Sequence, residues 1–385
     1  MKKRLILILS CVMVVSMLAG CGGSGSNQPV VKIGVFEPQS GDNGAGGKQE
    51  ILGMQFANHE TSTVEIGGKT YRVELQIADN QSSNANAPSA AQTLVSGGVA
   101  LVLGSYGSGV SMAASSVFED AGLTAIGVSC TNPGVTQGNS HYFRICFLDP
   151  FQGTVLANFA KDEFNASKAY VLAKQGDDYS VGLCNYFMQA FGEGNCIYET
   201  FPDGTSDYST YVANAKTSGV DVFFSPVSTE AAALIIDQAN TQNLGLPILA
   251  GDTWDSNVVT GAAEGKNVNI FVTTFYQEGG APDFDKGIKE WINGDSQAMT
   301  NNGGNDNIAA VTALGYDAYY MALEIIGAAG STDRAAILSA TPKTTYTGVT
   351  GLIEFDEIGD AKRDVAFIKK TDNSGIWTFV KQQGV

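Results

Sequence analysis

Positive charge is scarce in this sequence. Its 385 residues include 22 Lys and Arg against 39 Asp and Glu, so the formal net charge is −17. Nucleic-acid binding needs clustered Lys and Arg to neutralise phosphates, so this balance argues against a nucleic-acid partner. Histidine is scarcer still, because His59 and His141 are the only two, they lie far apart, and no Cys-x-x-Cys pair accompanies them. We therefore expect no zinc site or other metal centre, and no cofactor.

The N-terminus carries three basic residues followed by an apolar run of roughly fourteen residues, too short for a helix to span a bilayer. This layout predicts a secretory signal peptide over residues 1–20. Its end, "LAGC", resembles the lipobox of bacterial lipoproteins, which implies that Cys21 becomes the lipidated first residue of the mature chain. Residues 21–30 are rich in Gly and Ser and predict a flexible tether. We expect an exported protein, lipid-anchored to the outer face of the cell membrane or periplasmic, folded from about Val30.

Cysteine sets few constraints. Four cysteines follow Cys21, namely Cys130, Cys146, Cys184 and Cys196. An exported protein can form disulfides, but four cysteines allow three connectivities and sequence alone does not choose between them. Cys184 and Cys196 are the favoured pair, because a predicted helix carrying Cys184 leads into the predicted strand carrying Cys196. Buried free thiols are the alternative.

Short apolar runs separated by helix-length segments are abundant, a pattern typical of parallel strands crossed by helices. The alternation extends over residues 31–128 and restarts over residues 151–251. Long helical patterns then cover residues 282–330, and three predicted strands end the chain. The length also favours two domains. The sequence therefore predicts an α/β protein of two lobes with parallel-sheet cores, and the late helices could return to the first lobe.

The stretch "GSYGSG", residues 104–109, joins a predicted strand to a predicted helix. A phosphate-binding loop would need a lysine where this chain has Val110. A nucleophile turn would need Gly-x-Ser-x-Gly and a nearby base, and Ser108 has neither. Two interpretations remain: a tight turn that caps the helix, or a site for an anionic group formed by free backbone N–H groups, the helix dipole and the Ser108 hydroxyl.

A second hydroxyl-rich loop, "SCTNPG", brings Thr131 to the same edge of the predicted sheet, where open α/β sheets bind ligands. The corresponding strand ends of the second series carry Tyr179, Asp252 and Trp254. Donors on one lobe and a carboxylate on the other suit a zwitterion. We predict an α-amino acid, held at its carboxylate by Ser108 and Thr131 and at its ammonium by Asp252. Trp254 either walls this pocket or belongs to the core.

The sequence resembles the periplasmic binding proteins of the branched-chain amino acid type, the receptors of ABC importers, from about Val31 to the C-terminus. The resemblance rests on the order and spacing of "KIGVFEPQSG", "VLGSYGSGVSMAASSVFEDAGLTAI", "GDDYSVG", "AGDTWDS" and "ALGYDAYY". It implies that Ser108 binds the ligand carboxylate, that Thr131 touches both ends of the ligand, and that Ser129 offers a backbone carbonyl to the amine. It further implies that Tyr179 closes over the ligand and that Asp252 takes the ammonium.

The chain departs from this family's pattern at two positions near the ligand. Val227 replaces an aromatic residue of the second lobe, and Cys130 precedes Thr131. Tyr106 and Trp254 would add bulk and hydrogen-bonding groups to the region around the ligand. The preference for a ligand side chain therefore need not be leucine-like.

The resemblance also implies a type I periplasmic binding protein fold with a three-crossover hinge near Leu148, Tyr276 and Phe355. The function expected is that of a monomeric, non-enzymatic receptor that captures an amino acid, a branched-chain one or another apolar or aromatic one, between two closing lobes and delivers it to an ABC permease in the membrane. A receptor for an amine-free ligand, such as an amide, urea or an aromatic acid, and a ligand-sensing domain that signals to a partner are the alternatives. The boundaries expected are residues 31–148 with 277–354 for lobe 1 and residues 149–276 with 355–385 for lobe 2.

Overall fold

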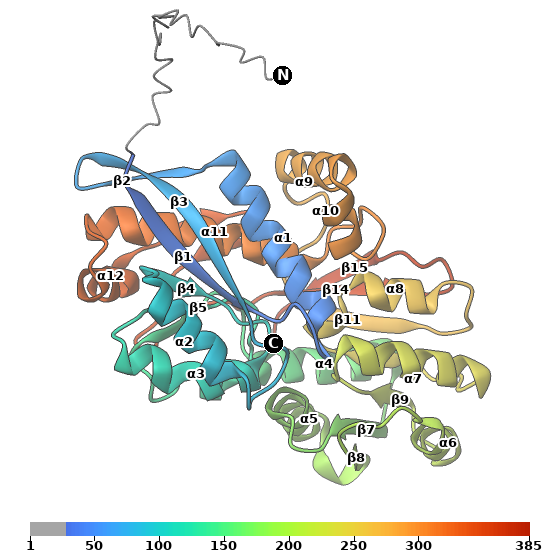
Figure 1. The fold of residues 1–385 in the computed structure, drawn as a ribbon. Coiled ribbons are helices and arrows are strands. Elements are labelled where there is room, and N and C mark those ends of the chain that lie inside the picture. The colour runs from blue at the N-terminus through green and yellow to red at the C-terminus, as the bar shows by residue number, and fades with distance from the viewer. Residues whose placement is uncertain (1–27) are drawn as a thin grey trace, which may run out of the picture.

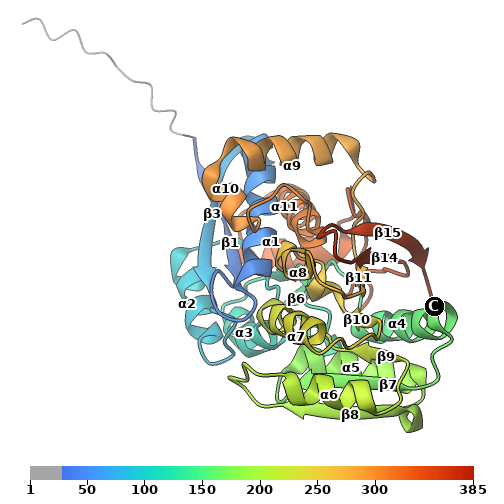
Figure 2. The same cartoon turned by 90° about the vertical axis from the view of Figure 1, so that its right-hand side faces the viewer.

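The computed structural model describes residues 28–385 as two lobes, each built on its own sheet (Figures 1 and 2). Both sheets have mainly parallel strands with helices packed against them, so the predicted α/β class with two parallel-sheet cores is confirmed. The predicted signal peptide, Cys21 and most of the predicted tether lie outside the described residues. Within residues 28–385, no helix is both long and apolar enough to cross a membrane.

The first sheet has six strands in the order β2-β3-β1-β4-β5-β6. They are β1 (Val30–Glu37), β2 (Thr63–Ile66), β3 (Lys69–Asp79), β4 (Leu101–Leu103), β5 (Ala125–Gly127) and β6 (Tyr142–Arg144). All neighbours pair in parallel except β2, which forms an antiparallel hairpin with β3. Every residue of β4 and β5 is buried, as expected for strands covered by helices on both faces.

The second sheet has seven strands in the order β15-β14-β11-β10-β9-β7-β8. They are β7 (Ala169–Lys174), β8 (Cys196–Phe201), β9 (Val222–Phe224), β10 (Ile248–Ala250), β11 (Ile270–Thr274), β14 (Ala366–Thr371) and β15 (Thr378–Gln383). The strands from β7 to β11 are parallel, whereas β14 and β15 add an antiparallel edge. The last two predicted strands of the chain therefore belong to the second sheet.

The first of the three late strands predicted from the sequence, "TGLIEFD", is part of a separate hairpin of β12 (Tyr346–Gly348) and β13 (Gly351–Ile353). The turn between them is held from outside. The backbone N–H groups of Val349 and Thr350 donate to the two carboxylate oxygens of Asp317, at 2.9 and 2.8 Å. Gly351 adopts a φ of +101°, which favours glycine. This reversal keeps the segment out of the main sheets.

Helices from two separate parts of the sequence accompany the first sheet, some packing on it directly and others on its covering helices. They are α1 (Gly44–Glu60), α2 (Ala87–Gly97), α3 (Ser108–Asp120), α9 (Pro282–Gly294), α10 (Ser296–Asn301), α11 (Ala310–Ala329) and α12 (Arg334–Ala340). In Figure 1 the orange helix α11 crosses behind the blue strands beside α1. Two glycines permit this close approach, because a Cβ on Gly53 would collide with the carbonyl of Thr312, and one on Gly315 with the carbonyl of Glu50.

Five helices accompany the second sheet. They are α4 (Asp149–Phe164), α5 (Asp178–Phe191), α6 (Ser209–Thr217), α7 (Thr229–Thr241) and α8 (Asn257–Ala263). Three of them begin with a capping side chain that accepts a backbone N–H of the first turn. These side chains are Asp177 for α5, Ser228 for α7 and Ser256 for α8. Each cap fixes the residue at which the loop ends and the helix begins. The loops between the strands and these helices are therefore short.

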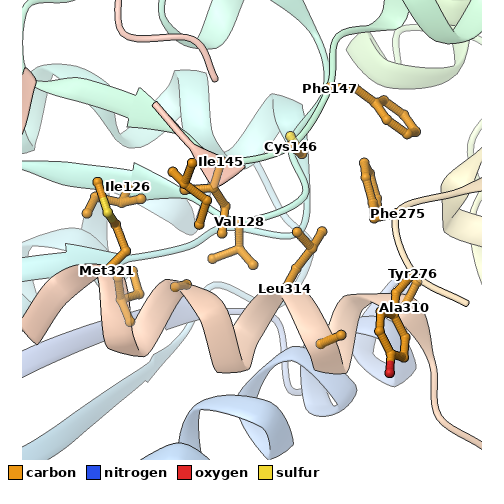
Figure 3. Packing of buried hydrophobic residues seen from close by; sticks show 14 of the residues in the cluster. Ile126, Val128, Ile145, Cys146, Phe147, Phe275, Tyr276, Ala310, Leu314 and Met321 are labelled. Atoms are coloured by element: carbon orange, nitrogen blue, oxygen red, sulfur yellow. The ribbon is translucent and has the colours of Figure 1, made fainter. Parts of the chain in front are cut away.

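Apolar packing is continuous between the lobes where the chain crosses (Figure 3). Leu314 of α11 lies close to Val128, which belongs to the first lobe. Further along the chain from Val128, the backbone leaves the first sheet through Cys146 and Phe147. The ring of Phe147 packs on that of Phe275 with centroids 4.2 Å apart. The two crossing segments thus share one buried contact.

The four cysteines of the described residues are all free thiols. Cys184 is buried and its Sγ points to the carbonyl of Leu172, whereas Cys196 is partly exposed and its Sγ points to the carbonyl of Gly192. The favoured Cys184–Cys196 disulfide is therefore wrong for this structure. The two side chains turn toward their own neighbouring backbone and satisfy their weak S–H donors there.

Candidate ligand-binding site

A cleft lies between the lobes, and the loops that follow the strands of both sheets form its walls. Four of the predicted site residues line it directly, namely Tyr106, Ser108, Ser129 and Tyr179. The first three come from the first lobe and the last from the second. The cleft therefore occupies the carboxyl edges of two parallel sheets, the position at which open α/β sheets bind ligands.

Ser108 stands at the start of α3, directly after the extended residue Gly107. Its Oγ accepts the backbone N–H of Asn132 at 3.2 Å, so the hydroxyl proton is free to donate elsewhere. The first N–H groups of a helix have no partner within the helix and carry the positive end of its dipole. Together these donors make the "GSYGSG" turn suited to an anionic group.

The neighbouring loop carries Ser129 and Thr131. Ser129 lines the cleft and its hydroxyl donates to the carboxylate of Glu50. Thr131 is fully buried one layer deeper, and among residues 28–385 its Oγ1 has no hydrogen-bond partner. A buried hydroxyl without a partner is rare in folded proteins. Burial raises the pKa of the Asp149 carboxyl next to this hydroxyl, and the hydroxyl partly offsets that rise, so Thr131 offers a donor close to both Asp149 and the Ser108 turn.

Asp252 opens a short 3-10 turn, Asp252–Trp254, in the second lobe. Its Oδ1 accepts the hydroxyl of Tyr179 at 2.9 Å and the amide of Gln152 at 2.8 Å. Its own backbone N–H also stabilises the carboxylate, and no other residue among 28–385 donates to Oδ2. Burial raises the pKa of this carboxyl to about 6, which leaves it largely ionised at neutral pH. A buried carboxylate oriented by two donors and free at one oxygen can accept an ammonium.

Trp254 and Tyr106 differ in position. Trp254 is fully buried in the second lobe's core, where its Nε1 donates to the carbonyl of Val227 at 2.9 Å, and it does not line the cleft. Tyr106 does line the cleft. Its ring fills the space next to Gly46, and its hydroxyl donates across the lobes to the carbonyl of Thr253 at 3.2 Å. Of the two interpretations of Trp254, core packing agrees with this structure.

A family model described as periplasmic binding protein matches residues 30–373. The chain belongs to the periplasmic binding protein family. Family members are receptors for solutes. A Leu/Ile/Val-binding protein homolog 1 from Brucella abortus is 31% identical to it over 279 residues, which is 71% of this chain and 72% of that protein.

Solved structures place this binding protein beside amino-acid receptors. The leucine-binding protein LivK of Thermotoga maritima superposes with a TM-score of 0.80 at 32% identity, covering 92% of this chain and 99% of LivK. The branched-chain amino acid binding protein LivJ of Streptococcus pneumoniae, solved with isoleucine, gives 0.79 at 25% identity with the same coverage. A Rhodopseudomonas palustris solute-binding protein solved with benzoate is 16% identical and shares the fold.

The lobes of this binding protein touch across the cleft. Lys174 of the second lobe forms an ion pair with Asp42 of the first at 2.6 Å. The side-chain amide of Asn132 donates to the carbonyl of Asp178 at 2.8 Å. With the Tyr106 bond to Thr253, these contacts join the two lobes across the cleft.

Sequence reasoning missed a pair of buried glutamates beneath the cleft. Glu37 ends β1 and its Oε2 accepts the backbone N–H of Tyr106 at 2.6 Å, while Glu50 lies on α1. Burial, and then the charge of Glu50, raise the pKa of Glu37 well above its usual value; burial raises the pKa of Glu50 to about 7. Two such carboxyls in contact favour one shared proton. An acidic residue closing the apolar run "VKIGVFE" was the available signal.

Arg144 is the second omission, although it stands in the apolar run "HYFRICF". It is fully buried and pairs with Asp360. Its Nη1 donates to the carbonyls of Cys130 and Asn132 at 2.9 and 2.6 Å, and its Nη2 to the hydroxyl of Thr136 at 2.9 Å. The guanidinium therefore holds the loop that carries Ser129 and Thr131.

Proposed function

We propose that this protein is the solute receptor of an ABC importer and that it captures an amino acid between its two lobes. The observation that carries the proposal is the pairing of donors on one wall with a buried carboxylate directly behind Tyr179 of the other wall. Among residues 28–385, the Ser108 hydroxyl proton has no acceptor, and Oδ2 of Asp252 accepts from no other residue. The similar proteins are leucine- or branched-chain amino acid-binding proteins, which supports the same class of solute.

In this proposal Ser108 and Thr131 bind the carboxylate of the ligand, and Asp252 binds its ammonium. Ser129 contributes its backbone carbonyl to the amine, and Tyr179 closes over the ligand while orienting Asp252. A micromolar dissociation constant corresponds to about −8 kcal/mol, which a few charge-assisted hydrogen bonds and apolar contact can supply. The proposal includes no catalytic step.

Closure of the lobes is part of the proposed binding. A carboxylate buried without a cation is costly, which is reflected in the raised pKa of Asp252. An ammonium placed against Oδ2 would remove that cost, so an amine stabilises the closed state more than the open one. We propose that the lobes move about crossovers near Leu148, Tyr276 and Phe355, with lobe boundaries as expected from the sequence.

The broader setting of the proposal is an exported receptor held at the membrane by lipid on Cys21, which acts as a monomer and delivers its solute to a permease. The assignment to an importer rests on the family and the relatives. A ligand-sensing output would use the same cleft. Uptake of the bound solute by cells that carry both this protein and the proposed permease would distinguish transport from sensing.

A thermal-shift screen of the twenty amino acids and a set of small acids and amides tests the ligand class. A ligand at one hundred times its dissociation constant adds about 2.7 kcal/mol to the free energy of unfolding, which raises the melting temperature measurably. We expect at least one amino acid to do so and amine-free compounds not to. Stabilisation by amine-free compounds alone would refute the proposal.

Two variants then test the residue roles. Asp252→Ala should abolish the shift by the amino acid, and Ser108→Ala should reduce it, because each removes one of the proposed contacts. Asp237→Ala is the matched control, since this carboxylate is exposed on α7 of the same lobe. If Asp252→Ala responds to the amino acid as strongly as the wild type, the assignment of the ammonium site is wrong.

A further inference from the structure

We infer that the amino acid taken by this cleft has a side chain that donates hydrogen bonds, and that it is not an aliphatic one. The inference rests on the proposed amino-acid-binding function and adds the chemistry of the ligand side chain. The inference is drawn from the part of the cleft that the proposed carboxylate and ammonium sites do not occupy.

Polar groups from both lobes form this outer part of the cleft. The first lobe contributes Asp42, Asn43 and Asn84, and the second contributes Asp177 and Ser228. The aliphatic residues in the wall are Val110 and Pro38, and the rings of Tyr106 and Tyr179 add aromatic surface. An aliphatic side chain gains free energy in proportion to the apolar surface it covers, and here that surface is interrupted by polar groups.

Acceptors are in excess in this wall. Its cation, Lys174, is already engaged by two carboxylates, those of Asp42 at 2.6 Å and Asp203 at 2.7 Å. One carboxylate oxygen of Asp177 accepts the N–H of Ser180 and so caps α5. Its other oxygen remains available as an acceptor. A ligand with N–H or O–H groups would find acceptors here, whereas a further anion would face carboxylates whose cation is taken.

Asn43 supplies the specific observation. Its backbone N–H donates to the hydroxyl of Ser82 at 3.0 Å, and the residue precedes α1 without capping it through its side chain. Its Oδ1 is buried and has no hydrogen-bond partner among residues 28–385. A buried acceptor left unpaired by an apolar ligand lowers the affinity by roughly tenfold or more relative to a ligand that donates to it.

Isosteric pairs of amino acids test the inference by isothermal titration calorimetry on the protein begun at residue 28. The pairs are asparagine with leucine, threonine with valine, and glutamine with methionine, whose members differ mainly in hydrogen-bonding groups. We expect the polar member of at least one pair to bind at least about tenfold more tightly than its apolar partner. We also expect asparagine to bind more tightly than aspartate, which has the same shape but only acceptors.

Two results would overturn the inference. One is an aliphatic amino acid that binds as tightly as every polar one, and the other is aspartate binding more tightly than asparagine. Either result leaves the proposed function intact, because an amino acid still binds. If none of the twenty amino acids binds, the proposed function itself fails, so the two failures are distinguishable.

The variant Asn43→Ala identifies the acceptor. It should lower the ratio of the leucine to the asparagine dissociation constant, or the corresponding ratio for the preferred pair, by about tenfold toward unity. Because a ratio is measured, a general loss of folded protein does not mimic the effect. Asn293→Ala, an exposed position on α9, is the control and should leave the ratio unchanged. An unchanged ratio in Asn43→Ala would contradict the role of Asn43.

Discussion

Replacement of Arg144 by Met should destabilise the protein and weaken ligand binding together. The side chain is fully buried, pairs with Asp360, and donates to the carbonyls of Cys130 and Asn132 and to the hydroxyl of Thr136. Methionine fills much of the volume but supplies none of these donors. Removal of one partner of a buried ion pair costs about 3–5 kcal/mol, because the other charge stays buried and unpaired.

Urea unfolding of the unliganded protein, followed by circular dichroism, measures this cost. Arg144→Met together with Asp360→Leu should recover part of the loss, since the double variant leaves no isolated charge. Arg144→Lys should keep the charge but lose the fork whose three nitrogens reach Asp360, the two carbonyls and the Thr136 hydroxyl. Its stability should therefore lie between the wild type and Arg144→Met.

The ligand provides the second measurement. The loop anchored by Arg144 carries Ser129 and Thr131, so loosening it should raise the dissociation constant measured by calorimetry on the protein that remains folded. Arg144→Lys should restore affinity less completely than it restores stability, because a single ammonium cannot bind Asp360, the two loop carbonyls and the Thr136 hydroxyl together. A loss of under about 1 kcal/mol in Arg144→Met would show that the buried network contributes no more than a surface pair, and the reasoning would fail.

Three further predictions concern other sites. Burial raises the pKa of Asp149 to about 8 from 3.8, so the folded state holds its proton to higher pH than the unfolded state. The free energy of unfolding should then fall as pH rises from about 4 to 8, by at most about 1.4 kcal/mol per unit from this group, and urea titrations of Asp149→Asn should show a flatter dependence. Gly46→Ala should displace the Tyr106 ring and weaken binding in calorimetry, whereas Gly261→Ala, whose Cβ would meet open space, should not. Protein begun at residue 28 should yield four thiols in denaturant without reductant; two would indicate a disulfide.

The fold was largely predictable from the sequence, because parallel strands buried on both faces correspond to short continuous apolar runs. The segment "VALVLG" is an example, with every residue of β4 buried. The hairpin of β12 and β13 was not readable. Its strand pattern resembles the others, and its turn depends on Asp317, which lies on α11 more than thirty residues earlier. Contacts this distant in sequence leave no local pattern.

The loop positions of the site were also predictable, since polar residues that follow parallel strands meet at one edge of a sheet. The depth of each residue was not. Trp254 and Tyr106 are both aromatic residues in such loops, yet the first packs in the core and the second reaches across the cleft to Thr253. Rotamer and packing decide between these outcomes, and neither is encoded in residue type or spacing.

The sequence by itself determined the α/β class, the two series of strands and the loops that carry Ser108, Thr131 and Asp252, because these follow from periodicity and residue type. Tertiary structure alone decided that Glu37 and Glu50 face each other, that Arg144 holds the ligand-side loop, and that Asn43 keeps an unpaired acceptor in the cleft wall. The physical reason is that pairing and burial of polar groups depend on which distant segments meet. The contacts between those distant segments therefore set the free energies of the buried polar groups.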